Sequence, residues 1–283
     1  MAKLKYGLIG YPVKHSLSPA MHNAAFNELG MDAEYSLFEV EPKELDIFLK
    51  EMPAKKISGL NVTIPHKIGA RDYIEKSGVL DENAGKLGAV NTIKPGDDGK
   101  LRGYNTDGPG FYRSLVEDLK FEPEGRTVFV LGAGGAARAV VMYLGNGPKR
   151  IIVSDVDNKR AEDLKSQYLK YYDKSRIEIT TGADISGAIA GADLLVNATP
   201  VGMREADPSP VEKSMLRAGM YVYDLVYNRP VTELVKAAQR ARCYASTGLG
   251  MLLYQGAIAF EIWTGRQAPI AVMRKALKAA LRT

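Results

Sequence analysis

The segment RTVFVLGAGGAARAVVMYLG at residues 126–145 restricts the possible folds more than any other part of the chain. It places an apolar strand, a turn with three glycines and an apolar helix in immediate succession. The next segment, PKRIIVSDVDNKRA, predicts a second strand that ends at Asp155. A strand, a helix and another strand in this order form a βαβ unit of a parallel sheet. We therefore expect a Rossmann-type, doubly wound α/β domain in the second half of the chain.

Strands and helices also alternate in the first half. LKYGLIG, SPAMHNAAFNELG and AEYSLFEV predict a strand, a helix and a strand, with Ser18 as the helix cap and Pro19 as its first residue. The segment GLNVTIPHK at 59–67 alternates polar and apolar residues like a half-buried strand, and Pro65 ends it. AVNTIKPGDDGKLRGYN predicts two short strands around a turn. These elements predict a second α/β domain with a mostly parallel sheet.

We place the change of domain between about residues 108 and 125, ahead of the second α/β series that follows the polar linker FEPEGR at 121–126. We assign residues 1–108 to an N-terminal domain and residues 109–249 to the Rossmann-type domain. The sequence leaves open whether the helices at about 250–283 pack back on the first domain. A chain of 283 residues is long enough for two domains with separate cores.

The composition narrows the classes of function and location. The single cysteine, Cys243, excludes an internal disulfide framework, and no signal-peptide pattern precedes the first strand, so we expect a cytoplasmic protein. The apolar stretch at 250–263 is too short to span a bilayer and is expected to be a buried helix. The histidines have no metal-ligand spacing, which argues against a metal site.

The net charge of +5 could indicate a nucleic-acid partner, but a small anionic ligand fits it as well. The basic residues are interleaved with acidic ones and form no stripe of arginines and stacked aromatics, so we expect no nucleic-acid partner. We expect no membrane partner either. Both a monomer and a homodimer remain possible from the sequence.

The glycine turn has the spacing of a dinucleotide-binding motif. Gly132, Gly134 and Ala137 occupy the G-x-G-x-x-G/A positions, where they permit a tight turn, close approach of a pyrophosphate and packing of helix on strand. The helix N-terminus then offers N–H groups to the phosphates. A further strand, the third of this domain in our reading, is predicted at 192–202 and ends in polar residues at Asn197 and Thr199.

The residue that ends the second predicted strand of this domain bears on the choice of cofactor. Asp155 lies 23 positions after Gly132, near the spacing at which an acid binds the adenosine ribose 2′-hydroxyl. A carboxylate there favours NAD, because it repels the 2′-phosphate of NADP. NADP stays possible, since Lys159 or Arg160 could compensate. The alternative role of Asp155 is a helix N-cap.

The lysine that ends GLNVTIPHK lies just past a strand terminus. Ligands of open α/β sheets bind outside the carboxyl ends of the strands, so Lys67 is a candidate site residue. The alternative is a lysine on a solvated loop.

Several motifs together resemble one known family. GYPVKHSLSPAMHN, GLNVTIPHK, GAVNT, GYNTDG, LGAGGAARA, NATPVGM, DLVYN and GLGMLLYQGA closely resemble, in order and spacing, the shikimate dehydrogenases and their shikimate/quinate relatives. The resemblance implies reversible, NAD(P)-dependent hydride transfer between 3-dehydroshikimate and shikimate, in aromatic amino-acid biosynthesis. One departure bears on the cofactor. NADP-using members carry an N-R-T type segment after the second strand, where this chain has Asp155, Val156 and Asp157.

The resemblance also implies roles for individual residues. Lys67 and Asp107 would form the catalytic pair. Substrate would be bound by Ser16, Ser18 and Tyr227 at its carboxylate, by Thr63, Asn91 and Gln255 at its ring hydroxyls, and by Asn61, Lys67 and Asp107. The cofactor would contact Gly132, Ala133, Gly134, Gly135, Ala136, Asp155, Val156, Thr199, Met203, Leu225, Gly248 and Met251.

The chemistry supports the catalytic pair independently. Oxidation of a secondary alcohol by hydride transfer needs a group that takes the hydroxyl proton. A free lysine, with a pKa of about 10.4, is a poor base at neutral pH, although burial lowers such a pKa and a neighbouring carboxylate raises it. We therefore expect Lys67 to be the general acid–base and Asp107 to orient it and to hydrogen-bond the reacting hydroxyl.

Alternatives remain open at this point. Quinate differs mainly by a hydroxyl on the carbon that bears the carboxylate, and a pocket rejects one added hydroxyl poorly. The two serines favour shikimate, but they could also have a purely structural role. A non-catalytic dinucleotide-binding protein is a third possibility, against which the presence of Lys67, Asp107, Asn91 and Gln255 counts.

Overall fold

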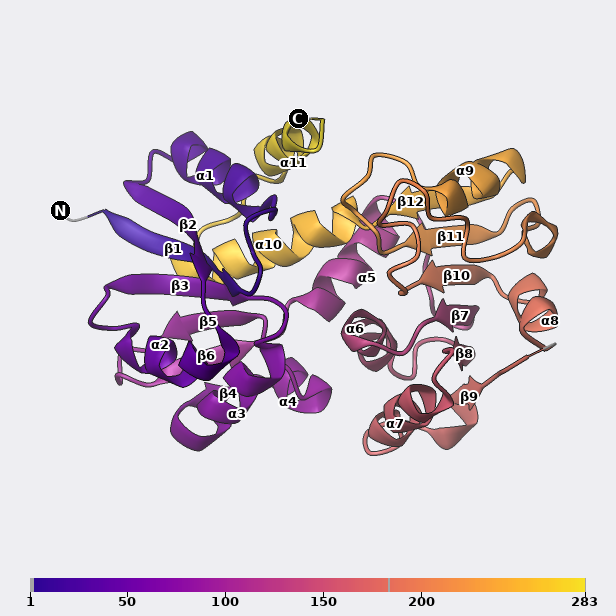
Figure 1. Ribbon diagram of the computed structural model, residues 1–283, viewed down its shortest axis with the longest axis horizontal. Helices are drawn as coiled ribbons and strands as arrows, with labels where there is room; N and C mark the ends of the chain where they lie inside the picture. Colours follow the sequence, from indigo (N-terminus) through magenta and orange to yellow (C-terminus); the bar gives the residue numbers. More distant parts are fainter. Residues whose placement is uncertain (1–2, 183, 283) are drawn as a thin grey trace. The chain divides into compact units, whose positions relative to one another are not determined.

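The computed structural model describes residues 3–182 and 184–282, which form two compact units (Figure 1). Unit 1 comprises the described residues of 1–106 and 253–283, and unit 2 comprises those of 107–252. In the described part of the chain, each unit contains a six-stranded sheet. The predicted fold class, two α/β domains, is confirmed.

Unit 1 has the strand order β2-β1-β3-β5-β6-β4. The pairs β1/β2, β1/β3 and β4/β6 are parallel, and β5 runs antiparallel to its neighbours. The elements are β1 (Leu4–Gly10), α1 (Ser18–Glu28), β2 (Ala33–Glu39), η1 (Pro42–Glu44), α2 (Leu45–Glu51), β3 (Ile57–Val62), α3 (Lys67–Ser77), β4 (Val79–Leu80), α4 (Glu82–Leu87), β5 (Thr92–Pro95), β6 (Leu101–Tyr104), most of α10 (Leu249–Thr264) and α11 (Ile270–Ala280).

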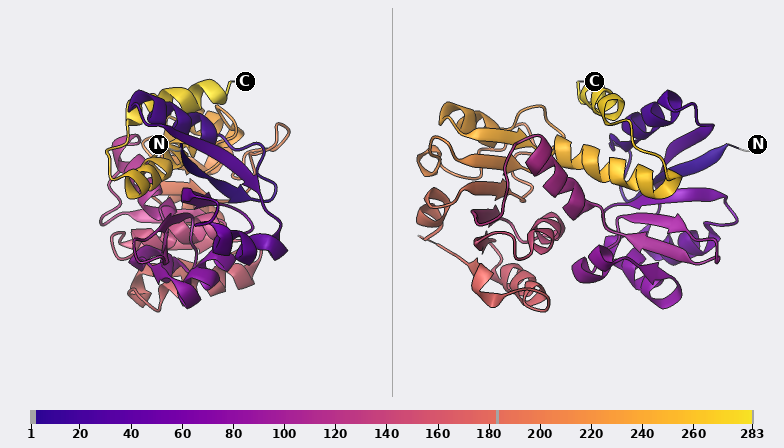
Figure 2. Two further views of the ribbon diagram at one scale, coloured as in Figure 1. Left: turned by 90° about the vertical axis from the view of Figure 1, so that its left-hand side faces the viewer. Right: turned by 180° about the vertical axis from the view of Figure 1, so that it is seen from behind.

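The sheet of unit 1 is covered on both faces. Helix α11 lies beside α1, and in the view from behind in Figure 2 the C-terminal part of α10 crosses in front of the strands. Trp263 on α10 packs where a Cβ at Gly59 would lie and donates a 3.0 Å hydrogen bond to the carbonyl of Ile93. The expectation of a half-buried strand over residues 61–64 is wrong, because β3 ends at Val62 and both Asn61 and Val62 are buried.

Unit 2 has the strand order β12-β11-β10-β7-β8-β9, and all of its described strand pairs are parallel. This is the Rossmann order, with the topological switch point between β7 and β10. The elements are α5 (Asp107–Glu117), β7 (Thr127–Leu131), α6 (Gly135–Leu144), β8 (Arg150–Ser154), α7 (Asn158–Tyr168), η2 (Lys174–Arg176), β9 (Ile177–Ile179), α8 (Asp184–Ala190), β10 (Leu194–Asn197), η3 (Lys213–Met215), β11 (Tyr221–Asp224), α9 (Glu233–Arg240) and β12 (Tyr244–Thr247).

The strand predicted at 192–202 is the fourth strand of unit 2 and not the third, because the short β9 precedes it. Alternate strand residues of the sheet are buried on opposite faces. Phe129, Leu195 and Val222 belong to one core cluster with residues of α8 and α9, while Val128 and Val196 are fully buried on the other face. Helices on both faces make this a doubly wound sheet. Among the helices that the structure describes, none combines the length and apolar character needed to cross a bilayer.

Candidate active site

Five strand ends of unit 2 bring most of the predicted cofactor residues to one edge of its sheet. Gly132, Asp155, Thr199, Leu225 and Gly248 lie just beyond the carboxyl ends of β7, β8, β10, β11 and β12. Because these strands are parallel, their carboxyl ends share one edge. Ligands of such sheets bind outside this edge, next to the switch point.

The glycine turn after β7 leaves room for a ligand. Gly132 has a φ of +101°, and a Cβ there would lie 2.9 Å from the carbonyl oxygen of Ala198, so packing requires a glycine. A Cβ at Gly134 or Gly135 would instead meet no protein atom within 4 Å. The two glycines therefore keep open a space at the N-terminus of α6, whose N–H groups suit a pyrophosphate.

The neighbours of the glycine turn fit a dinucleotide as well. Ala137 is fully buried and allows α6 to pack closely on its strand. Ala133 is buried in the turn, and Ala136 is exposed beside the two open glycines. The first turn of α6 contains no acidic residue that would repel a phosphate.

Asp155 is held against the glycine turn. One oxygen accepts a 2.7 Å hydrogen bond from the backbone N–H of Ala133, and the other accepts a 2.8 Å bond from that of Asp157. The N-cap of α7 is Asp157, whose side chain accepts from the N–H of Lys159. The alternative that Asp155 is a helix N-cap is therefore wrong. Val156, next in the chain, is fully exposed.

The two cations after Asp155 have acidic partners. Lys159 pairs with Asp163 at 3.0 Å, and Arg160 pairs with Asp157 at 3.3 Å. All four side chains are largely exposed, so these pairs are weak and can rearrange.

A buried polar network lies behind the switch point. Asn197, the last residue of β10, donates to a carboxylate oxygen of Asp224 at 2.9 Å and accepts from the hydroxyl of Thr199 at 2.7 Å. The other oxygen of Asp224 accepts from Thr232 at 2.6 Å. Burial raises the pKa of Asp224, although these hydrogen bonds oppose the rise. The sequence motif DLVYN contains Asp224, but no role was predicted for it.

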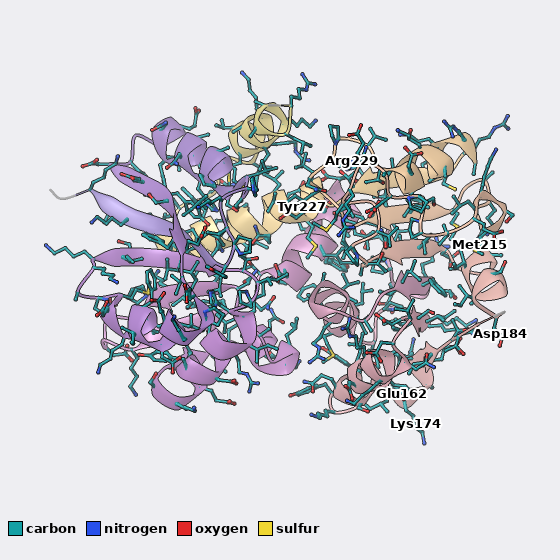
Figure 3. The ribbon with its side chains drawn as sticks, viewed as in Figure 1. Glu162, Lys174, Asp184, Met215, Tyr227 and Arg229 are labelled. Atoms are coloured by element: carbon teal, nitrogen blue, oxygen red, sulfur yellow. The ribbon has the colours of Figure 1, made fainter. Side chains whose placement is uncertain are left out.

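Three further predicted residues of unit 2 lie on irregular segments or at a helix start. Met203 is half exposed, and its carbonyl accepts a 3.0 Å hydrogen bond from Asn228. Tyr227 lies in the exposed segment after β11, where Figure 3 labels it beside Arg229. The N–H of Met251, near the start of α10, donates to the hydroxyl of Tyr223 at 3.1 Å.

In unit 1, Ser16 and Ser18 lie at the N-terminal end of α1. The helix begins at Ser18, its N-cap is Leu17, and the cap has no side-chain hydrogen bond. The prediction of Ser18 as the helix cap is therefore wrong. The side chain of Ser16 accepts a 3.2 Å bond from the N–H of Ser18, as the structural role considered for the serines would require.

Asn61 and Asn91 belong to one buried hydrogen-bond network in unit 1. The Asn61 carbonyl accepts from the Tyr35 hydroxyl at 2.8 Å, and its amide donates to the carbonyl of Asn91 at 3.2 Å and to Thr92 at 3.1 Å. Asn91 accepts at 2.8 Å from the N–H of Thr106 and donates to the hydroxyl of that residue at 3.0 Å. The network holds Asn91 beside the chain segment that leads to Asp107.

Lys67 is the first residue of α3, just beyond β3. Its carbonyl accepts a 2.9 Å bond from the N–H of Val90, while the ring of His66 bonds the carbonyl of Val40 at 2.7 Å. The N–H of Thr63 donates to the carbonyl of Ile9, which ties the turn to β1. The backbone at Lys67 is thus fixed to neighbouring strand ends.

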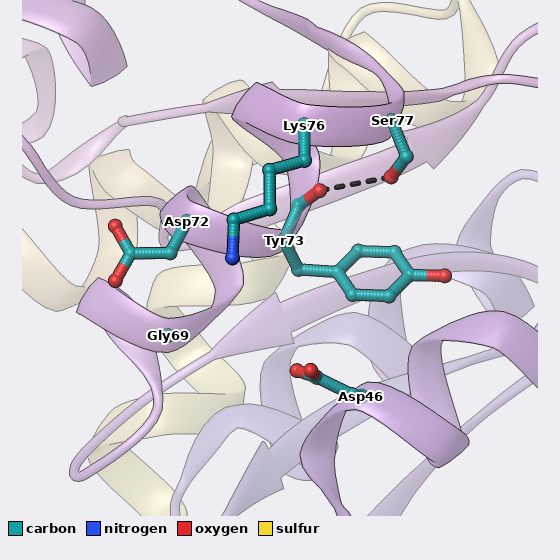
Figure 4. A pocket seen from close by; sticks show the side chains of 6 residues that line it. All are labelled: Asp46, Gly69, Asp72, Tyr73, Lys76 and Ser77. Carbon is teal, nitrogen blue, oxygen red and sulfur yellow. Dashed lines mark hydrogen bonds between the residues drawn. The ribbon is translucent and has the colours of Figure 1, made fainter.

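Asp107 begins α5 in unit 2, and Gln255 is a buried residue of α10 in unit 1. The pairing of Lys67 with Asp107 and the substrate contacts of Gln255 stay predictions. A surface hollow between α2 and α3 contains none of the predicted site residues (Figure 4). It is lined by Asp46, Gly69, Asp72, Tyr73, Lys76 and Ser77.

Comparison with known protein families covers both units. Residues 8–93 match the family described as the shikimate dehydrogenase substrate binding domain, and residues 115–248 match shikimate / quinate 5-dehydrogenase. Residues 248–278 match the shikimate 5′-dehydrogenase C-terminal domain.

Individual relatives are similar over nearly their whole length. The shikimate dehydrogenase (NADP+) of Methanopyrus kandleri is 46% identical over 98% of this chain and 95% of its own. A shikimate dehydrogenase solved with NADP+ has a TM-score of 0.89 and 38% identity, covering 99% of this chain and 96% of the other. The enzyme of Listeria monocytogenes, solved with shikimate and NAD, has a TM-score of 0.89 and 33% identity, covering 97% and 96%.

Proposed function

The chain belongs to the shikimate dehydrogenase family, and we propose that it catalyses the reversible NAD(P)-dependent interconversion of shikimate and 3-dehydroshikimate. The observation that carries this proposal is the open glycine turn at the switch point of unit 2, in a chain whose first unit matches the family's substrate-binding domain. A bound nicotinamide dinucleotide would supply the acceptor for the hydride. We expect a cytoplasmic enzyme with a small organic acid as its substrate.

The catalytic roles are assigned to Lys67 and Asp107. Lys67 takes the proton of the reacting hydroxyl during oxidation and returns it during reduction. Asp107 orients the lysine and hydrogen-bonds the same hydroxyl. The fixed backbone at the start of α3 supports this assignment, because a general acid–base must be held at a defined position relative to the reacting atoms.

Ser16, Ser18 and Tyr227 are assigned to the substrate carboxylate, and Thr63, Asn91 and Gln255 to the ring hydroxyls. The buried network orients the Asn91 amide before substrate arrives. Asn61 uses both of its N–H groups within this network, so it is expected to contact substrate only through its carbonyl oxygen.

We further propose that the enzyme prefers NAD to NADP. Asp155 is held beside the glycine turn by two backbone N–H groups, and a carboxylate at the end of the second Rossmann strand suits a ribose 2′-hydroxyl. A 2′-phosphate would meet this negative charge, and Lys159 and Arg160 would have to leave their present acidic partners to offset it. The preference would distinguish this chain from its relatives described as NADP+ enzymes.

The proposal is tested by incubating the purified protein with shikimate and NAD or NADP and following reduction of the nicotinamide. We expect turnover with shikimate to exceed turnover with quinate. Cofactor binding without turnover of any cyclic hydroxy acid would indicate a non-catalytic dinucleotide-binding protein. Efficient turnover of quinate alone would replace the proposed substrate.

A further inference from the structure

A carboxylate that the proposed reaction does not use lies fully buried behind the cofactor edge of unit 2. Asp224, the last residue of β11, has no exposed surface. One of its oxygens accepts from Thr232 at 2.6 Å, and the other accepts from the amide of Asn197 at 2.9 Å and from the N–H of Val226 at 3.2 Å. Burial of an ionised carboxylate is costly, and its retention at this position calls for a role.

The acceptor oxygens of Asp224 determine which way the Asn197 amide points. A carboxylate only accepts hydrogen bonds, so Asn197 must direct its N–H groups toward Asp224 and its carbonyl oxygen away from it. The carbonyl oxygen accordingly accepts from both the N–H and the hydroxyl of Thr199, at 3.1 and 2.7 Å. The Asn197 amide also donates a 3.1 Å hydrogen bond to the carbonyl of Val201, so that it holds both ends of the loop that follows β10.

This loop, residues 198–201, forms one wall of the glycine turn. A Cβ at Gly132 would lie 2.9 Å from the carbonyl oxygen of Ala198 and 3.2 Å from the Thr199 methyl carbon. Because the loop lies this close to the glycine turn, it cannot move toward the turn. Movement of the loop away from the turn would widen the crevice between β7 and β10. The position of Thr199 is therefore coupled to the shape of the crevice.

We propose that Asp224 is a positioning residue for the dinucleotide, which it serves by orienting Asn197 and, through Asn197, the loop that carries Thr199. This inference rests on the proposed function, in that the crevice between β7 and β10 takes a nicotinamide dinucleotide. Asp224 itself touches neither cofactor nor substrate.

The test measures binding of NAD and of NADP by calorimetry, without substrate, together with the KM for shikimate and the melting temperature. Asp224→Ala removes the acceptor of Asn197. We expect dinucleotide binding to weaken about tenfold or more, because a buried hydrogen-bond acceptor is lost, with little change in the KM for shikimate. Asp224→Asn can keep an oxygen directed at Asn197 and should restore most of the binding.

Two further variants separate positioning from loss of stability. Thr232→Val removes the bond to the opposite oxygen and leaves the bond to Asn197, so it should lower the melting temperature but not weaken dinucleotide binding. The double variant Asn197→Ala/Asp224→Ala should bind the dinucleotide no more weakly than Asn197→Ala alone. Both substitutions remove the same connection, which runs from Asp224 through Asn197 to the loop.

The inference is overturned if Asp224→Ala binds both dinucleotides like the unmodified protein, or if Thr232→Val weakens binding as much as Asp224→Ala does. Failure of the unmodified protein to bind either dinucleotide would overturn the proposed function instead. If Asp224→Ala does not fold, dinucleotide binding by Asp224→Asn is compared with dinucleotide binding by Asn197→Ala. Equal weakening of binding in these two variants contradicts the inference.

Discussion

The carboxylate of Asp155 accepts a 2.7 Å hydrogen bond from the backbone N–H of Ala133, which joins the end of β8 to the glycine turn after β7. One side chain thus both stabilises the turn and places a negative charge beside it. Any change at Asp155 must therefore be judged for its effect on the turn as well as on the charge.

Asp155→Asn is predicted to shift the cofactor preference toward NADP. An asparagine oxygen can still accept from Ala133, while the negative charge that opposes a 2′-phosphate is removed. The ratio of kcat/KM for NAD to that for NADP should favour NAD in the unmodified enzyme and fall about tenfold in the variant, as expected for loss of a charge–charge repulsion of roughly 1 kcal/mol or more. Glu162→Gln, which changes an exposed acid on the same helix α7, is the control. A clear preference of the unmodified enzyme for NADP would refute the role assigned to Asp155.

Gly134→Val is predicted to impair cofactor binding without impairing folding. The φ of Gly134 is −73°, and a Cβ there meets no protein atom within 4 Å, so the chain itself tolerates a side chain. The added carbons would occupy the space proposed for the pyrophosphate. We expect the KM for the dinucleotide to rise about tenfold or more, as when a misfit costs 1–3 kcal/mol, at an unchanged melting temperature.

Gly187→Ala on α8 is the matched control, because its Cβ also meets no protein atom within 4 Å. It should leave the KM for the dinucleotide unchanged. An unaltered KM in Gly134→Val would show that the pyrophosphate binds elsewhere.

Ser18→Ala is predicted to raise the KM for shikimate and to leave the KM for the dinucleotide unchanged. Loss of a hydrogen bond to a charged carboxylate costs roughly 1.5–3 kcal/mol, which corresponds to about tenfold or more in KM. Ser77→Ala, which removes an exposed hydroxyl bonded to the carbonyl of Tyr73, is the control. Equal kinetic constants for Ser18→Ala and the unmodified enzyme would mean that Ser18 has no part in substrate binding.

His22 is predicted to make the protein less stable in acid. Its ring is fully buried and stacks on Tyr35 with centroids 4.4 Å apart, and burial lowers its pKa to about 3 from an ordinary value of 6.5. Below pH 6.5 the unfolded chain takes up a proton that the folded chain does not. The free energy of unfolding should therefore decrease as the pH falls from 6.5 toward 3, by up to about 1.4 kcal/mol per pH unit.

Urea unfolding of His22→Phe tests this contribution. The variant keeps an aromatic ring against Tyr35 and cannot titrate, so its stability should depend less on pH over that interval. Parallel pH dependences of the variant and the unmodified protein would contradict the assignment.

The residues of the cofactor edge could be predicted because their signal is local. The apolar strand, glycine turn and helix at 126–145, followed by Asp155 at the expected spacing, specify a βαβ unit without knowledge of the rest of the fold. The short strand β9 was not predicted, since three residues carry too little periodicity.

Features that depend on tertiary contacts could not be predicted in the same way. Asp224 ends an apolar strand like many aspartates, and only the folded chain brings it to Asn197, which lies on another strand, and to Thr232. Ser18 has the residue type of a helix cap, yet it is buried in the fold, and the helix begins at Ser18 itself with Leu17 as its N-cap. Asn61 is another such case, because the alternation of polar and apolar residues predicts a half-exposed side chain there, whereas tertiary contacts bury it.

The central claim is that Lys67 transfers the proton of the reacting hydroxyl. Lys67→Ala, assayed with shikimate and saturating cofactor, should lower kcat about 100-fold or more and change KM far less, as expected for loss of a general acid–base. Lys76→Ala, at the other end of the same helix, should leave both constants unchanged. A kcat for Lys67→Ala close to that of the unmodified enzyme would contradict the account.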